Sequence, residues 1–258
     1  SGVLSGQGGL NIVDNLSLGT IGGVANTYSG GTTLAAGKTI TIYKSGALGS
    51  GSVTMADNTT FAWGSSSTLE NEFTFNGATT VNPSTFSATF SGILSGQGGL
   101  NIVDNLSLGT PGGSANTYSG GTTLAANKTV TVNKSGALGS GSVTMADGTT
   151  LKWGAAATLV NPFTFNGTTT LNPAGFSASL TGVLSGAGGI NIVDNLSLGT
   201  IGDIANTYSG GTSISANKTV TVNKSGALGT GIVTMADNTT LQFGASATIP
   251  NAITVTGN

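Results

Sequence analysis

The sequence predicts an all-β protein folded as a parallel β-helix, a solenoid whose turns stack along one axis. Three observations support this fold class. A 90-residue unit repeats without gaps, short apolar runs alternate with a period of two residues, and turn residues recur at fixed positions. The units are expected to cover residues 1–90, 91–180 and 181–258, the last one truncated, and to form one continuous solenoid from residue 1 to residue 258.

The repeat is seen most easily in the octet NTYSGGTT at residues 26–33. It returns at residues 116–123 and, as NTYSGGTS, at residues 206–213. The first two units are identical at 69 of 90 aligned positions, and the third matches the second at 55 of its 78. A fixed period without insertions is typical of stacked arrays, because each repeat must contact its neighbour in the same register. The boundary segment FSATFSGILSG holds no polar linker, which favours one rod over three separate domains.

Alternating apolar residues predict short strands throughout each unit. Ile40 with Ile42, Phe61 with Trp63, and Phe73 with Phe75 are examples, and no segment shows a helical period. About ten strand segments per unit, at two to three strands per turn, predict about four turns per unit. The whole chain would then hold about 11 turns and form a rod on the order of 50 Å long.

The turns between these strands are marked by an exchange of glycine and asparagine. One position of the unit holds Gly37, Asn127 and Asn217, and another holds Asn58, Gly148 and Asn238. These two residue types adopt a positive φ most readily. The exchange therefore predicts a left-handed backbone conformation at both positions.

The composition excludes several classes of function. Charged residues make up 6% of the chain, the net charge is −2, and the chain contains no His, Cys or Arg. Catalytic triads, disulfides and thiolate chemistry are thereby excluded, and no basic cluster is present for nucleic acid. No apolar run reaches the length of a membrane-spanning helix, so we expect no membrane insertion.

Carboxylates provide the only candidates for catalysis or metal binding. Glu70 and Glu72 are expected on one face of a strand, about 6–7 Å apart, a spacing that some glycosidases use. The second unit has Val160 and Pro162 at these positions, which favours a surface pair. Asp14, Asp104 and Asp194 stand in a glycine-rich segment that faintly resembles a calcium-binding repeat, but one Asp per copy favours a structural role. We predict no catalytic residue, no metal site and no cofactor.

Threonine and tyrosine residues suggest two binding surfaces. The TxT pairs are Thr39/Thr41, Thr129/Thr131 and Thr219/Thr221. An ice-binding face needs such pairs on adjacent turns, whereas these recur about four turns apart, so strand propensity is the favoured explanation. Asn26 and Tyr28 and their equivalents, including Tyr118, could form glycan-binding corners. Packing is favoured there, as it is for Trp63, which alternates with Phe61.

The unit also resembles the passenger-associated repeat of bacterial autotransporters. The pattern SGxGGL, LxL, NTYxGGTTL, a turn, and ALGxGxV appears at residues 6–18, 26–34, 37–42 and 47–55, and again 90 and 180 residues later. It covers over half of each unit. Residues 21–25 resemble an insertion into this pattern, and the aromatic-rich residues 59–90 lie outside it. The resemblance implies a right-handed parallel β-helix in the passenger of a type V secretion system, displayed on a Gram-negative surface.

We therefore expect a non-enzymatic structural or adhesive region that acts as a fibre or stalk outside the cell or at its surface. Its expected partners are further copies of the chain, side by side or end to end, and host or bacterial surface glycans or proteins. A glycan-binding module is the alternative, and a polysaccharide-cleaving enzyme using Glu70 and Glu72 is the third hypothesis. Anchoring segments are expected outside this chain, which we interpret as part of a longer array.

Overall fold

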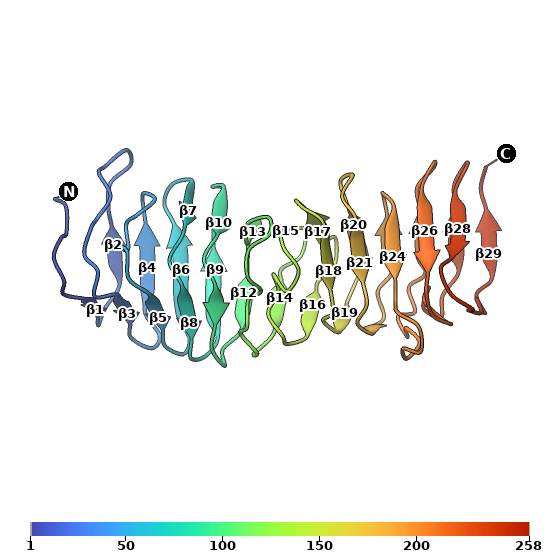
Figure 1. Ribbon diagram of the computed structural model, residues 1–258, viewed down its shortest axis with the longest axis horizontal. Helices are drawn as coiled ribbons and strands as arrows, with labels where there is room; N and C mark the ends of the chain where they lie inside the picture. The colour runs from blue at the N-terminus through green and yellow to red at the C-terminus, as the bar shows by residue number, and fades with distance from the viewer. Residues whose placement is uncertain (1, 258) are drawn as a thin grey trace.

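The structure is a computed structural model that describes residues 2–257, and these residues form an elongated rod of stacked turns (Figure 1). They contain 29 short strands and no helix, and all the strand pairings between successive turns are parallel. The predicted fold class is confirmed: the chain is an all-β, right-handed parallel β-helix of about 12 turns. At one strand spacing per turn, the rod is about 60 Å long.

Each turn crosses three faces of the rod, with one strand position on each face. Face 2 carries nine strands that are hydrogen-bonded in sequence. They are β2 (Leu16–Leu18), β4 (Thr39–Ile42), β6 (Thr59–Trp63), β9 (Thr79–Asn82), β12 (Leu100–Ile102), β14 (Thr122–Leu124), β16 (Val143–Met145), β19 (Phe163–Phe165) and β22 (Leu184–Ser185).

Face 3 carries ten strands. They are β7 (Ser67–Leu69), β10 (Ala88–Phe90), β13 (Leu106–Leu108), β15 (Thr129–Val132), β17 (Thr150–Trp153), β20 (Thr169–Asn172), β23 (Ile190–Ile192), β25 (Thr212–Ile214), β27 (Val233–Met235) and β29 (Ile253–Val255).

Face 1 holds two five-stranded sheets. The first contains β1 (Leu10–Ile12), β3 (Thr32–Leu34), β5 (Val53–Met55), β8 (Phe73–Phe75) and β11 (Leu94–Ser95), and the second β18 (Ala157–Leu159), β21 (Ala178–Leu180), β24 (Leu196–Leu198), β26 (Thr219–Val222) and β28 (Thr240–Phe243). Two turns of irregular backbone join them. There the Thr117 N–H donates to the Leu94 carbonyl, and the Ser140 N–H donates to the Tyr118 carbonyl.

Two irregular segments of this kind occur in each unit, and both occupy strand positions. In the first unit they are residues 26–29 and 46–50, which stack because the Ser50 N–H donates to the Tyr28 carbonyl. Eleven strands and two irregular segments make thirteen positions per unit, and at three positions per turn one unit spans four and one third turns. The expectation of about four turns was therefore close, but the extra third of a turn has a large consequence.

That consequence is a rotation of each unit relative to the one before it. The equivalent strands β1, β12 and β23 lie on face 1, face 2 and face 3 respectively. The same holds for β5, β16 and β27. Every feature of the repeat is consequently displayed on a different side of the rod in each unit, about 21 Å further along the axis.

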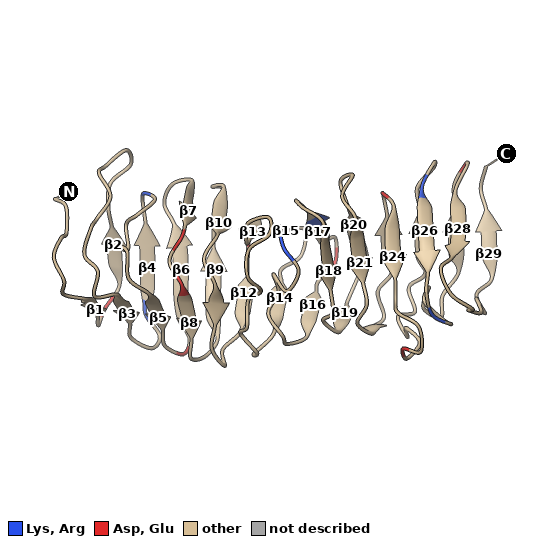
Figure 2. Cartoon of the chain, in the orientation of Figure 1, with Lys and Arg blue, Asp and Glu red and all other residues tan. Residues whose placement is uncertain are grey.

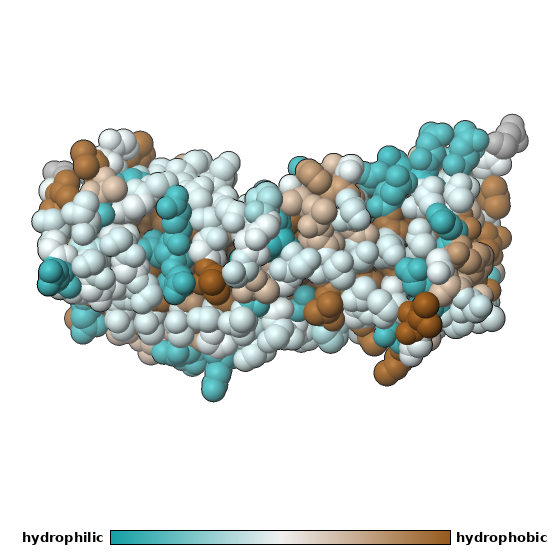
Figure 3. Space-filling model, viewed as in Figure 1, coloured by the Kyte–Doolittle hydropathy of each residue, from teal (hydrophilic) through white to brown (hydrophobic). Residues whose placement is uncertain are grey.

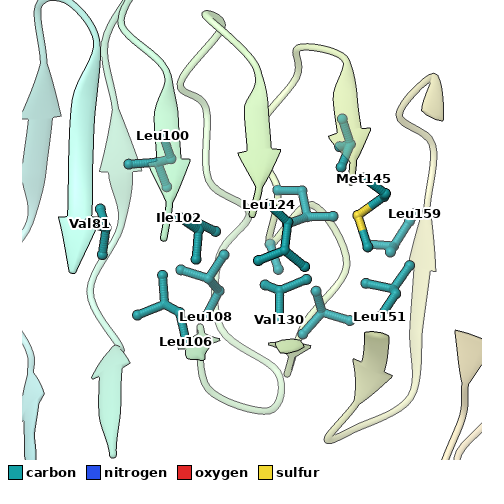
Figure 4. Close-up of a cluster of buried hydrophobic side chains, with 14 of the residues drawn as sticks. Val81, Leu100, Ile102, Leu106, Leu108, Leu124, Val130, Met145, Leu151 and Leu159 are labelled. Atoms are coloured by element: carbon teal, nitrogen blue, oxygen red, sulfur yellow. The ribbon is translucent and has the colours of Figure 1, made fainter. Parts of the chain in front are cut away.

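The core is one continuous column filled by every second residue of the strands. Strand burial patterns alternate, as in β14, where Thr122 and Leu124 are buried and Thr123 between them is exposed. Figure 4 shows Leu124 and Val130 packed inside the rod among aliphatic side chains of neighbouring turns. The predicted period-two interpretation is thus confirmed. The aromatic-rich residues 59–90 fill one stretch of this column, where Phe61, Trp63, Phe73 and Phe90 pack edge to face.

The corners confirm the predicted left-handed positions. Gly37, Asn127 and Asn217 have φ values of 70°, 59° and 61°, and Asn58, Gly148 and Asn238 have values of 56°, 68° and 54°. A different requirement acts at Gly98, where a Cβ atom would lie 2.0 Å from the Gly77 carbonyl oxygen of the preceding turn. Adjacent turns approach so closely at this corner that only glycine fits.

We predict that Leu124→Ala destabilises the fold by about 2–5 kcal/mol, because it leaves a cavity in a close-packed column. Thr123→Ala on the same strand removes only an exposed side chain and is expected to cost less than about 1 kcal/mol. Urea unfolding followed by circular dichroism measures both changes. Equal effects of the two substitutions would contradict the assignment of inward and outward residues.

We predict that Gly98→Ala lowers the melting temperature by several degrees, because the added methyl group collides with backbone of the neighbouring turn. Gly8, the equivalent residue of the first unit, is the matched control, since no atom lies within 4 Å of a Cβ built there. Differential scanning calorimetry compares the two variants. A Gly98→Ala protein as stable as Gly8→Ala would show that the turns are spaced more widely at this corner.

Candidate functional site

The outward side chains form columns of hydroxyl and amide groups that cross many adjacent turns. We name these columns the hydroxyl ladders. The face 2 ladder contains Thr39, Thr60, Thr80, Asn101, Thr123, Thr144, Thr164 and Ser185, each paired in register with the next. The face 3 ladder contains Thr129, Thr150, Thr170, Asn191, Ser213, Thr234 and Thr254. Neighbouring rungs are one strand spacing apart, about 4.8 Å.

The hydroxyl ladders cross more adjacent turns than the TxT pairs predicted, but they hold fewer parallel columns. The pairs of the three units lie on β4, β15 and β26, which belong to three different faces. Other segments of the unit fill the intervening turns with threonine, a relation that sequence spacing alone does not reveal. On face 2 only the column of Thr39 is continuous, because the neighbours of Thr41 on adjacent turns are Ser17 and Ala62. The paired columns that an ice-binding face needs are therefore not present on face 2 at this point.

Glu70 and Glu72 do not lie on a strand, and this expectation was wrong. They stand at the corner between β7 and β8, on either side of Asn71. The Asn71 side chain is buried and donates to the carbonyl oxygens of Gly49 and Gly51 on the preceding turn. Because Asn71 must point inward to make these bonds, both glutamates are exposed at a corner whose shape is set by the backbone.

Asp14, Asp104 and Asp194 link adjacent turns. Each pairs with a lysine 24 residues later, and the three oxygen–nitrogen distances are 3.2, 2.9 and 3.0 Å. Burial raises the pKa of Asp194, but hydrogen bonds from Lys218, Asn195 and Gly175 outweigh it, so the net pKa is lowered. Among residues 2–257 no three carboxylates gather into a metal-binding group. The hydrogen bonds and ion pairs of these aspartates therefore stabilise the stacking of adjacent turns.

The tyrosines of the repeated octet are inside the rod, which favours the packing interpretation. The Tyr118 hydroxyl is 2.7 Å from Thr122 Oγ1, and burial raises the Tyr118 pKa well above its usual value. Asn26 is also buried; its amide donates to Ala47 and its oxygen accepts from Leu4. Tyr118 is therefore no surface contact for a glycan. Trp63 is buried in the core as expected.

Each unit also buries one lysine, which the sequence pattern does not predict. Lys44, Lys134 and Lys224 lie under the loops at residues 19–25, 109–115 and 199–205, the segment that resembled an insertion. The Lys44 ammonium donates to the Val24 carbonyl oxygen, and the loop glycines pack on the lysine stems. The sequence does hold one signal of a structural role for these lysines, because six of the seven lysines stand at two repeated positions of the unit.

The loops above these lysines expose apolar side chains at the surface of the rod. In the third unit Ile201 and Ile204 at the loop surface are 81% and 74% exposed, and Ile21 and Val24 are similarly exposed in the first. Burial lowers the pKa of Lys134 and of Lys224, and the charge of Asp203 partly restores that of Lys224. The Lys224 Nζ atom is buried without a hydrogen-bond partner among the described residues.

The surface around these features carries little charge. Figure 2 shows the few charged residues scattered along the rod, and Figure 3 shows a largely polar but weakly hydrophilic surface with separate apolar spots. In the described part of the chain no helix is long and apolar enough to span a membrane. Comparison with protein-family models, curated proteins and solved structures found no match to this chain.

We predict that Lys224→Met stabilises the protein at neutral pH by about 1 kcal/mol, because it removes a buried ammonium that lacks a partner. A lysine whose folded-state pKa is lowered weakens the fold while protonated, so wild-type stability should rise with pH from that lowered pKa towards the ordinary value of 10.5. The variant should lose this part of the alkaline rise. Thermal unfolding measured over a pH series tests both statements.

Lys44→Met is the matched control, because the Lys44 ammonium donates to a backbone carbonyl oxygen. Removing it leaves that oxygen without its donor, and a loss of stability is expected. If both methionine variants destabilise the protein equally, the two ammonium groups have similar environments and the interpretation of Lys224 is wrong.

Proposed function

We propose that this chain is a non-enzymatic structural or adhesive repeat region that acts as a fibre or stalk. The observation that carries this proposal is the single buried core, which runs without interruption from Ile12 to Val233 along a rod of about 12 turns. A column of this kind has its length set by the number of turns, and it needs no separate domain boundary between units. Such a body is suited to holding a group at a distance from a surface.

The resemblance of the unit to the passenger-associated repeat supports a more specific form of the proposal. The motif segments at residues 6–18, 26–34 and 47–55 return in all three units. On this basis we propose a surface-displayed or secreted autotransporter-like protein, exported through the outer membrane and located outside the cell. The parallel β-helix is compatible with this assignment but is shared by proteins of other functions.

The chemistry of the surface argues for assembly more than for catalysis. Glu70 and Glu72 lie at a corner on either side of an inward Asn71, and the other units lack both carboxylates. The hydroxyl ladders, in contrast, present neutral polar groups over many turns. Two such faces can approach without charge repulsion and exchange hydrogen bonds with water or with each other. We therefore propose side-by-side association of rods, with end-to-end association as the second mode.

We predict that the purified chain grows into dimers or larger species as its concentration rises. Sedimentation velocity from micromolar to millimolar concentration measures this. Lysines placed at Thr80 and Thr123, two turns apart on the face 2 ladder, should reduce the association by repulsion between rods. Lysines at Thr33 and Thr74, also two turns apart, are the matched control on the shorter face 1 column of Asn11, Thr33, Thr54, Thr74 and Ser95, which ends after five rungs, and should have a smaller effect.

A stable elongated monomer at all concentrations would contradict self-association and would assign the rod a spacer role. Equal loss of association in both pairs of lysine variants would show that general charge, rather than the face 2 ladder, controls the contact.

A further inference from the structure

Two equivalent grooves open on the surface of the rod where one unit follows another. Groove A, about 260 Å³ in volume, is lined by residues of β10, β13, β15 and the preceding loop. Groove B, about 400 Å³, is lined by the equivalent residues 90 positions later on β21, β24 and β26. Because each unit is rotated by one face, groove A lies on face 3 and groove B on face 1.

The floor of each groove is a set of hydroxyl groups on three adjacent turns. In groove A these are Thr89, Ser107 and Thr131, which are paired in register across the strands. The amide of Asn133 donates to Ser107 Oγ over 2.8 Å and orients that hydroxyl. In groove B, Ser197 and Thr221 repeat this arrangement, and Asn223 donates to Ser197 Oγ, also over 2.8 Å.

The wall of each groove is a phenylalanine held by a strained turn. Phe176 is 43% exposed at groove B, whereas the equivalent Phe86 at groove A packs partly against the core. The turn before Phe176 is closed by the Phe176 N–H, which donates to the Pro173 carbonyl. Ala174 within it has a φ of 55°, a conformation that is unfavourable by about 1–2 kcal/mol for a residue with a Cβ atom. Strain of this kind is often retained where it positions a functional side chain.

No charged residue lines either groove. The charges that adjoin the lining residues in the sequence, at Asp104 with Lys128 and at Asp194 with Lys218, are joined in ion pairs. Beyond the floor of groove A the exposed Lys152 is paired in register with Thr131, whereas Gln242 takes this place beside Thr221 at groove B. Because the linings themselves are uncharged, a ligand that fits both grooves needs no charge, exchanges hydrogen bonds with a row of hydroxyls, and offers an apolar face to an aromatic ring. We propose that grooves A and B each bind a neutral oligosaccharide.

The positions of the grooves determine how many chains of sugar one rod can hold. They lie on different faces, about four and one third turns apart along the axis, which is about 21 Å. One straight polysaccharide cannot follow both faces, so each rod binds two separate chains and can bridge them. This inference goes beyond the proposed stalk function and does not depend on self-association of the rod.

Isothermal titration calorimetry with three neutral hexasaccharides, namely cellohexaose, chitohexaose and maltohexaose, tests the proposal. We expect at least one of them to bind with two sites per chain. Phe176→Ala should weaken the site at groove B about tenfold, which corresponds to the loss of one aromatic contact. Thr131→Val, which keeps the branched shape of the side chain, should weaken the other site. A hexamer of galacturonic acid is expected not to bind groove B, where Gln242 stands in the place that Lys152 takes beside groove A.

Thr41 occupies the same position of the first unit and lines neither groove, so Thr41→Val is the matched control and should leave both sites unchanged. Failure of all three neutral hexasaccharides to bind would overturn the proposal. Two unchanged sites in the Phe176→Ala/Thr131→Val double variant would also overturn it, as would binding of the acidic hexamer at groove B as tight as that of the neutral sugars. Sugar binding is measured by calorimetry and self-association by sedimentation. Failure of the oligosaccharide proposal is therefore distinguishable from failure of the fibre proposal.

Discussion

The in-register stacking of one parallel turn on the next is the interaction on which the rest of this structure depends. Each strand exchanges backbone hydrogen bonds with the turns before and after it. Residues paired in register on successive turns therefore all point inward or all point outward. Apolar residues gather in one column, and hydroxyl residues gather in ladders outside it. A chain with so few charges remains folded because this single arrangement satisfies its backbone and its apolar side chains together.

The thirteen strand positions of each unit are the second constraint. Since three positions make one turn, equivalent residues advance by one face per unit, and a feature present once in the repeat appears on all sides of the rod. The core must accept this rotation. Phe61 on face 2 is replaced by Leu151 on face 3 and Leu241 on face 1, so the same strand fills the column from three directions. Such a rod presents its grooves and loops radially, which suits contact with several partners at once.

The candidate sites show where reasoning from residues alone succeeds. The structural role of Asp104 followed from a count of available ligands, and burial of Trp63 followed from its alternation with Phe61. Glu70 and Glu72 were misplaced because a buried asparagine between them sets the corner, and alternation over three residues does not distinguish a strand from a corner. The buried lysines and the phenylalanine-walled grooves were missed because each brings together residues from different turns, about 20 or more positions apart.

The sequence by itself determined the all-β class, the period of the repeat, the alternation of core and surface, and the left-handed corners at Asn127 and Gly148. These properties are local, since they depend on residues two apart or on the backbone preference of a single residue. Only the tertiary structure decided that irregular segments occupy strand positions and that a unit spans a third of a turn beyond four. That fraction depends on which backbone groups pair between turns, and it places equivalent residues on three faces of one rod.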